Sequence, residues 1–127
     1  DKMAGANTSY RDLIVWQKAM DLTEKCYRAT QAFPTEERFG LTSQIRRSAV
    51  SVASNIAEGY GRDSDGSFIQ FLRISQGSLK ELETHLLLLR RLGLEADLPI
   101  TDALDNCDEL GRMIRSMIRS LKDRQPK

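Results

Sequence analysis

Side chains that could perform acid–base or metal chemistry are few in this sequence and form no recognisable set. The 127 residues include one histidine, His85, with Glu81 four residues before it. A ferritin-type di-iron site needs paired Glu-x-x-His motifs, and an α/β-hydrolase triad needs a nucleophile elbow. Neither pattern occurs in the sequence. We therefore predict that the protein is not an enzyme and uses no metal or cofactor.

The cysteines and the glycine-containing stretch add no reactive site. Cys26 and Cys107 are too few for a disulfide framework and lack a CxxC spacing, which favours buried thiols in a reducing cytoplasm. The stretch EGYGRDSDGS, residues 58–67, matches neither the GxxxxGK[ST] nor the GxGxxG phosphate-binding pattern. It is typical of a loop that ends in a helix cap, with Ser64 as the capping residue.

Polar and small side chains form a stripe along residues 36–58, beside the apolar stripe of the same segment. One interpretation is tight helix packing, in which small side chains let a neighbouring backbone approach and polar ones satisfy helix-end groups. The other is a small-molecule site formed by Gln44, Asn55, Glu58 and His85. The stripe and its expected match on the next segment comprise Gln44, Ser48, Ser51, Asn55, Glu58, Gly77 and Ser78.

Basic residues are the main surface feature, although the net charge of +1 gives only a weak overall field. All six charges between residues 95 and 109 are acidic, and six of the seven between 112 and 127 are basic. This division suits the dipole of a helix, so a solvated and salt-bridged helix is one interpretation. The alternative is binding of phosphates or of another partner. The candidate residues are Arg46, Arg47, Arg73, Lys80, Arg91, Arg112, Arg115, Arg119 and Lys122.

Four helices must position these side chains. Prolines at 34, 99 and 126 and glycines at 59, 61 and 66 interrupt otherwise periodic apolar segments. We predict helices near 11–32, 36–58, 66–92 and 99–122, joined by short links that favour antiparallel neighbours. The expected fold is all-α, an antiparallel up-and-down four-helix bundle over residues 10–122. Residues 1–9 are expected to be disordered or a cloning remnant, and 123–127 to form a tail.

The first two helices carry more apolar and small surface than one bundle core requires. Leu13, Trp16, Met20 and Tyr27 form one stripe of the first helix beside a second apolar stripe that starts at Val15. The second helix carries short side chains on nearly every face. This excess predicts self-association. The expected interface between copies comprises Leu13, Trp16, Met20, Val50, Ala53 and Ala57.

Several stretches resemble a known family in order and spacing. They are YRDLIVWQKAMDL (10–22), FPTEERFGLTSQIRRSAVSVASNIAEGYGR (33–62), FIQFLRISQGSLKELETHLLL (68–88) and the final amphipathic segment. Together they resemble the small bacterial four-helix-bundle proteins encoded by intervening sequences of 23S rRNA genes, relatives of the accessory variability proteins of diversity-generating retroelements. The resemblance covers residues 9–121. It implies a homopentamer without enzymatic activity and, in the retroelement branch, binding of a reverse transcriptase and RNA through basic surfaces.

These observations give three hypotheses about function. The first is a cytoplasmic, non-enzymatic homo-oligomeric scaffold or adaptor that binds RNA or a nucleoprotein partner through basic helix faces. The second is a protein–protein interaction module that touches no nucleic acid. The third is a small-molecule-binding bundle. No apolar run approaches the ~20 residues that a membrane-spanning helix needs, so none of the three involves a membrane.

Overall fold

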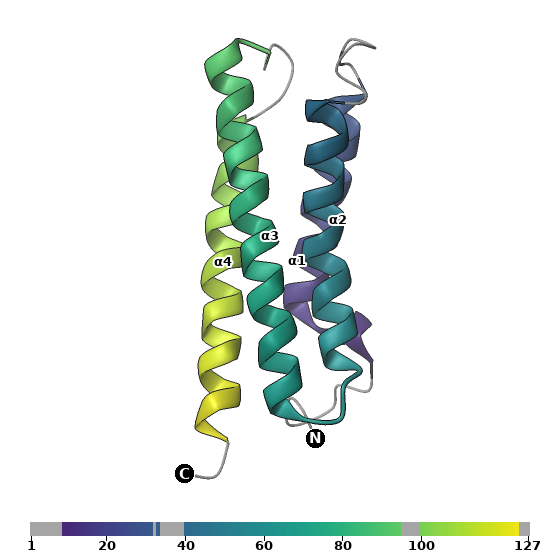
Figure 1. The fold of residues 1–127 in the computed structure, drawn as a ribbon, viewed down its shortest axis with the longest axis vertical. Helices are drawn as coiled ribbons and strands as arrows, with labels where there is room; N and C mark the ends of the chain where they lie inside the picture. Colours follow the sequence, from purple (N-terminus) through teal and green to yellow (C-terminus); the bar gives the residue numbers. More distant parts are fainter. Residues whose placement is uncertain (1–8, 32, 34–39, 95–99, 125–127) are drawn as a thin grey trace.

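Four α-helices make up the fold, preceded by a short 3-10 turn, η1, at Tyr10–Asp12 (Figure 1). The computed structural model describes residues 9–31, 33, 40–94 and 100–124. The helices are α1 (Ile14–Thr30), α2 (Leu41–Tyr60), α3 (Asp65–Leu92) and α4 (Ile100–Asp123). No β-strand occurs within these ranges, which confirms the all-α prediction of four helices. The proposed start of the second helix at 36, and the segments 1–8 and 125–127, lie outside the described residues.

The helix ends follow from local capping chemistry. The Ser9 hydroxyl accepts a hydrogen bond from the Arg11 amide, which closes η1 as a separate turn before α1. The Ser64 hydroxyl accepts one from the Ser67 amide at 3.1 Å, so Ser64 caps α3 as the sequence predicts. Gly93, with φ of 69°, ends α3 in the left-handed conformation that glycine adopts readily.

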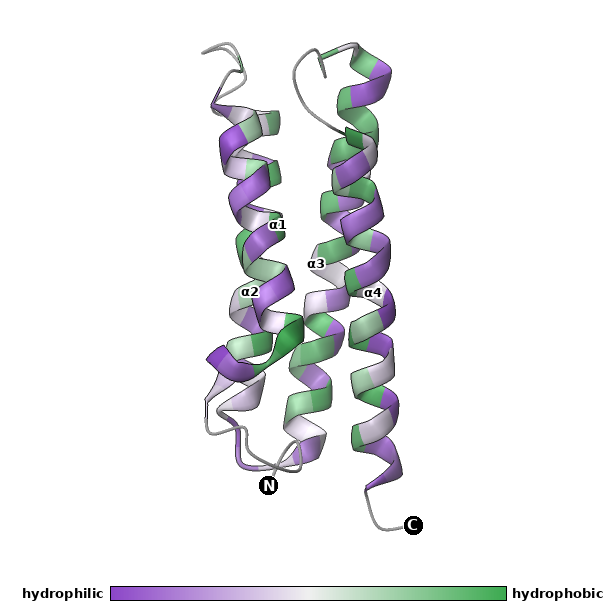
Figure 2. Ribbon diagram, turned by 180° about the vertical axis from the view of Figure 1, so that it is seen from behind, coloured by the Kyte–Doolittle hydropathy of each residue, from purple (hydrophilic) through white to green (hydrophobic). Residues whose placement is uncertain are grey.

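Each helix packs against two neighbours, in the order α1, α2, α3, α4 and back to α1 (Figure 1). Hydrogen bonds join the end of one helix to the start of the next, as from Arg46 to Thr30 at 2.9 Å and from Arg90 to Thr101 at 3.3 Å. Hydrophobic and hydrophilic residues alternate along every helix (Figure 2). None of the described helices is both long and apolar enough to span a membrane.

The buried core is continuous along the bundle and is formed mainly by leucine and isoleucine. Phe68, Leu72, Leu82 and Leu89 of α3 are fully buried. In α4 a seven-residue apolar repeat runs through Ala103, Cys107, Leu110, Ile114, Met117 and Leu121; all are buried except Met117, which is half-buried, while Ile118 takes the inward position. The change of spacing reflects the 3.6-residue turn of an α-helix, which drifts from a strict seven-residue repeat.

Gly59 is a packing residue, not the end of the second helix as the sequence predicted. The helix continues to Tyr60, and Gly59 is buried against α3. A Cβ atom at Gly59 would lie 2.6 Å from the Phe71 Cβ and 2.9 Å from the Phe68 Cδ1. The absence of a side chain therefore lets α2 and α3 approach closely just before the turn that joins them.

Candidate functional site

The polar stripe of α2 forms hydrogen bonds within the protomer. The Ser51 and Ser78 hydroxyl oxygens lie 2.7 Å apart across α2 and α3, and the Ser75 hydroxyl donates to the Val52 carbonyl at 2.8 Å. The Asn55 amide nitrogen donates to the Ser51 carbonyl at 2.8 Å. These bonds give the stripe a role in helix packing, because its polar atoms are satisfied partly by α3, at Ser51, and partly within α2, at Ser48 and Asn55.

The four residues considered for a small-molecule site do not converge. Asn55 is engaged with Ser51, and the Glu58 carboxylate pairs with Arg62 at 3.3 Å. Gln44 precedes Asn55 by three helical turns, about 16 Å along α2. His85 Nε2 is buried without a hydrogen-bond partner among the described residues, and the nearest Glu81 oxygen is 4.0 Å away. Within the described chain, none of the four residues lines the cleft or the hollows that are described below.

Arg46 is held against the end of α1 by neutral groups, which the sequence analysis does not predict. Its Nε donates to the Thr30 hydroxyl at 2.9 Å, and a second nitrogen donates to the Tyr27 carbonyl at 3.3 Å. Its guanidinium also lies over the Tyr27 ring, 4.6 Å from the centroid. Arg46 therefore connects α2 to the end of α1. Its role in binding a partner stays a prediction, and it does not line the cavities described below.

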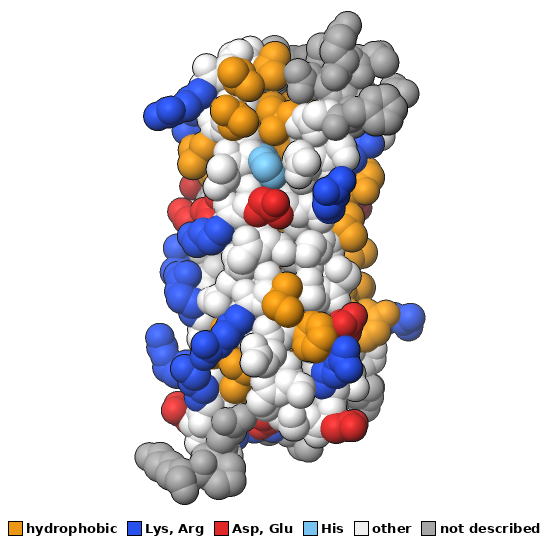
Figure 3. Space-filling model, in the orientation of Figure 1, with side chains coloured by type: hydrophobic (Ala, Val, Ile, Leu, Met, Phe, Trp, Pro, Cys, Tyr) orange, Lys and Arg blue, Asp and Glu red, His pale blue; other side chains and the backbone are white. Residues whose placement is uncertain are grey.

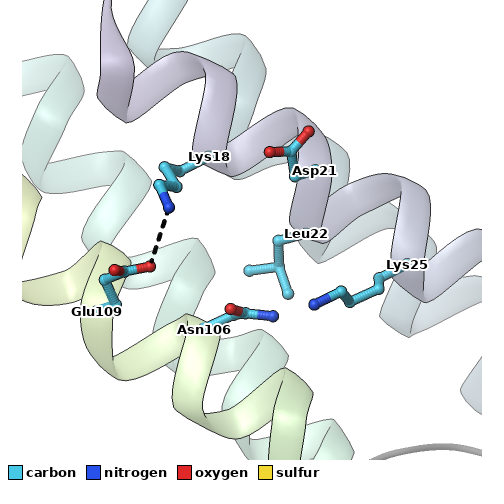
Figure 4. A pocket seen from close by; sticks show the side chains of 6 residues that line it. All are labelled: Lys18, Asp21, Leu22, Lys25, Asn106 and Glu109. Atoms are coloured by element: carbon cyan, nitrogen blue, oxygen red, sulfur yellow. Dashed lines mark ion pairs between the residues drawn. The ribbon is translucent and has the colours of Figure 1, made fainter.

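The acidic half of α4 is neutralised by α1. Lys25 pairs with Asp102 at 2.7 Å and Lys18 with Glu109 at 3.6 Å. Between these pairs lies a narrow cleft of about 180 Å³ (Figure 4). It is lined by Lys18, Asp21, Leu22, Lys25, Asn106 and Glu109. Cations and carboxylates alternate around it, so the cleft has no charge excess that would select a ligand.

The opposite flank of α4, facing α3, has a different character. Two neighbouring hollows of about 280 and 290 Å³ share Gln76 and Arg115. We call them together the cationic groove, formed by Arg73, Gln76, Gly77, Leu79 and Lys80 of α3 and Gly111, Arg115 and Ile118 of α4. No acidic side chain of the described chain lines either hollow. Figure 3 shows Lys and Arg side chains along this edge of the molecule, at the left of the view.

Three of the predicted basic residues, Arg73, Lys80 and Arg115, meet in this groove. Lys80 also pairs with Glu83 at 2.9 Å, which lies outside the lining. Arg73 and Arg115 form no ion pair with a described carboxylate. The remaining candidates, Arg47, Arg91, Arg112, Arg119 and Lys122, are exposed and do not line the groove. Three of the nine predicted basic residues therefore lie together in one groove.

Two glycines give the groove its depth. A Cβ atom at Gly111 would meet Arg115 Nη1 at 3.5 Å and Leu79 Cδ2 at 3.6 Å, which are ordinary contacts. A Cβ atom at Gly77 would meet no described atom within 4 Å. Gly77 therefore does not receive the close approach of α2 that the sequence suggested for the Gly77–Ser78 pair, and only Ser78 does. The sequence analysis does not identify Gln76 and Gly111 as groove residues. The signal for Gly111 was a glycine inside a periodic helical segment, like Gly77 in the preceding helix.

Exposed large apolar side chains lie on α1 and α2, as at Met20 and Val50, and equally on α3, as at Ile74 and Leu87. Met20 is 44% exposed and Val50 43%, and Tyr27 is also exposed. Trp16 and Ala57 are half-buried, and Trp16 makes an edge-to-face contact with Tyr10 at 5.2 Å. We call Trp16, Met20, Tyr27, Val50 and Ala57 the apolar face. Orange side chains follow the corresponding edge of the molecule in Figure 3.

Two residues expected at an interface between copies are buried within one chain instead. Leu13 is 2% exposed and Ala53 is 5% exposed. Leu13 points into the core because the η1 turn folds back beneath α1, and Ala53 lies on the side of α2 that faces its neighbours. Neither has surface to offer a second copy, so the prediction is wrong for this pair.

Comparison with known proteins identifies the family. The family model described as 23S rRNA-intervening sequence protein matches residues 11–116. The fold is similar to the crystal structure of a protein with unknown function from the S23 ribosomal protein family of Bacteroides thetaiotaomicron VPI-5482, with a TM-score of 0.73 and 24% identity. That similarity covers 83% of this chain and 98% of the other. A search of curated proteins finds no match. Because the family model spans most of the bundle, the chain belongs to the 23S rRNA-intervening sequence proteins.

Proposed function

We propose that the protein is a non-enzymatic scaffold, an antiparallel bundle that self-associates as a homopentamer in the cytoplasm and binds RNA or a nucleoprotein. The observation that carries this proposal is the separation of two surfaces on one protomer. The apolar face lies on α1 and α2, and the cationic groove lies between α3 and α4. One surface can therefore hold copies together while the other stays open to a polyanion.

Self-association is supported by the apolar face. Met20 and Val50 leave more than two fifths of their surfaces open to water on one protomer. Covering such side chains with a second copy stabilises the assembly by about 25 cal/mol for each square ångström of apolar surface removed from water. Exposed apolar residues that gather in one area are typical of protein interfaces.

Light scattering after size exclusion tests the assembly. We expect a mass above that of one 14.4 kDa chain that persists on dilution. The double substitution Met20→Glu/Val50→Glu should reduce the mass to that of a monomer, because it places charges in the buried contact. Ile74→Glu, at an exposed apolar residue of α3, serves as the matched control and should leave the mass unchanged. A compact native monomer at all concentrations would contradict the assembly proposal.

RNA binding is supported by Arg73 and Arg115 of the cationic groove, which form no ion pair with a described carboxylate, whereas Lys80 pairs with Glu83. Cations that lack carboxylate partners can exchange their counterions for phosphates, and the released counterions favour binding. A ring of copies would repeat the groove on each protomer, so modest charge per chain would become substantial in the assembly.

Fluorescence anisotropy with a labelled structured RNA tests this part. We expect measurable binding at low salt that weakens steeply as salt rises. Arg73→Glu/Arg115→Glu should reduce the affinity by at least about tenfold, while the assembly mass stays unchanged. Absence of binding at low salt, or binding that does not respond to salt, would contradict an RNA-binding role.

A protein–protein module is the second candidate, favoured by apolar residues on α3. Ile74 is 50% exposed and Leu87 is 47% exposed, and both lie outside the apolar face. They could contact a protein partner beside the cationic groove. A partner captured from cells that survives nuclease treatment, and that is lost in Leu87→Glu, would favour this function over RNA binding.

A further inference from the structure

Gly77 occupies a position that the fold itself does not explain. It lies in the middle of α3, where glycine destabilises a helix relative to alanine. Gly59 is explained by its close contact with Phe68 and Phe71, but no described atom lies within 4 Å of a Cβ placed on Gly77. The protomer therefore has room for a side chain at this position. Gly77 is exposed, so the space beside it is open to solvent or to a partner.

The surroundings of Gly77 indicate what could occupy that space. Lys80 and Arg115 line the same hollow, and Arg73 lines the adjoining one through the shared Gln76. Their ammonium and guanidinium groups, with the Gln76 amide, provide hydrogen-bond donors around a neutral floor of Leu79 and Gly111. Guanidinium groups fit phosphate oxygens in two-point contacts. The chemistry is that of a phosphate-binding groove in which the two guanidinium groups pair with no described carboxylate, while a phosphate would compete with Glu83 for Lys80.

We propose that the cationic groove binds the sugar–phosphate backbone of a double-stranded nucleic acid, with Gly77 as the point of closest approach and phosphates held by Lys80 and Arg115. This inference rests on the RNA-binding function proposed above and adds the form of the nucleic acid and the part of it that is contacted. A side chain at Gly77 would hold the backbone away from both cations.

The lining favours a duplex over a single strand. Proteins that bind single strands without sequence preference stack the bases on aromatic side chains. No aromatic residue lines either hollow of the groove in the described chain. Contacts restricted to phosphates and sugars suit double-stranded RNA, which is recognised mainly by its shape and backbone. The groove should therefore bind duplexes with little dependence on their sequence.

The groove is less suitable as a contact between copies of this chain. An identical groove on a second copy would present the same cations, and like charges repel. The exposed apolar residues Met20 and Val50 lie on α1 and α2, away from the groove. A duplex polyanion matches the charge of the groove, whereas a second copy matches the apolar face.

The test is Gly77→Gln, which fills the hollow without changing the charge or removing a cation. Binding is measured by anisotropy with an RNA duplex of about 16 base pairs and with its separate strands. We expect the wild type to prefer the duplex and Gly77→Gln to bind it at least about tenfold more weakly. The melting temperature should not fall, because glutamine is a better helix former than glycine. Ser120→Gln, on the other flank of α4, is the matched control and should bind normally.

Each other outcome overturns the inference and identifies what failed. Unchanged affinity in Gly77→Gln, together with weaker binding by Arg73→Glu/Arg115→Glu, would reject close approach at Gly77 and leave the RNA-binding function standing. Equal or tighter binding of single strands would reject the duplex. A lower assembly mass for Gly77→Gln would show that a second copy occupies the groove. Loss of binding in Ser120→Gln alone would place the nucleic acid on the other flank of α4. No RNA binding by any variant or by the wild type would reject the function as well.

Discussion

The two flanks of α4 differ in how their charges are used. Towards α1, Lys18 and Lys25 pair with Glu109 and Asp102, and the cleft between them carries mixed charge (Figure 4). Towards α3, Arg73 and Arg115 have no carboxylate partner in the described chain, and glycines leave the surface hollow. One helix thus contributes ion pairs to the fold on one side and unpaired cations on the other. Charge that is unpaired within the fold is the charge that can bind a partner.

The α1 flank covers two buried thiols, which provide the largest predicted effect. Burial raises the pKa of Cys26 from 9.0 to about 11, and burial together with the nearby Glu83 carboxylate raises that of Cys107 to about 12. Below pH 9 both thiols stay protonated in the folded and in the unfolded state, so the native state retains its full stability. Above pH 9 the unfolded chain releases them first, so the free energy of unfolding falls through the window from pH 9 to 12, by on the order of several kcal/mol.

Denaturant unfolding at several pH values between 8 and 11 measures this loss. The variant Cys26→Ala/Cys107→Ala should show a shallower decline than the wild type over the same interval. An identical decline in both proteins would show that the thiols do not ionise on unfolding in this range. The decline in the free energy of unfolding would then be due to other ionisable groups.

A comparison of two glycines gives the next largest effect. Gly59→Ala should lower the free energy of unfolding by about 2 kcal/mol, because its new Cβ would overlap Phe71 at 2.6 Å. Gly77→Ala should raise it by up to about 1 kcal/mol, because alanine favours the helix and nothing described obstructs it. Chemical denaturation measures both values. Destabilisation by Gly77→Ala would show that the groove is closed within the protomer.

The ion pairs of the α1 flank provide the smallest effect. A double-mutant cycle on Lys25 and Asp102 should give a coupling of about 0.5 kcal/mol, since both side chains are partly exposed and screened by water. Arg115→Gln, on the α3 flank, should leave the free energy of unfolding nearly unchanged because no ion pair is lost. If Arg115→Gln lowered the free energy of unfolding by as much as loss of the Lys25–Asp102 pair does, the two flanks of α4 would not differ in how their charges are used.

The sequence was sufficient to predict the helices and the core, because apolar periodicity and capping residues act locally. The Ser64 cap and the buried stripe of α3 are direct consequences of that local chemistry. The site depended on which helices become neighbours, and this cannot be read from periodicity within one helix. Periodicity within α2 does not show that the end of α1 places Tyr27 beneath Arg46. Nor does periodicity within α3 show that the surroundings of Gly77 are open.

The apolar residues that stay exposed on one protomer were predicted only in part, for a similar reason. A wide apolar arc on α1 indicates excess apolar surface but does not show which stripe turns inward. In the structure Val15, Ala19, Leu22 and Cys26 face the core, and Met20 remains at the surface. Leu13 becomes buried through the η1 turn, whose position depends on a hydrogen bond to Ser9 and not on helical spacing.

The central claim is that binding depends on the α3 flank of α4 and not on net charge. Its most direct test is the affinity for one duplex RNA of Arg115→Glu and of Lys18→Glu, two variants with the same change in net charge on opposite flanks. We predict that Arg115→Glu weakens binding by at least about tenfold, and that Lys18→Glu weakens it by less than about twofold. Equal weakening by both variants would show that only overall charge attracts the RNA, and would contradict the account.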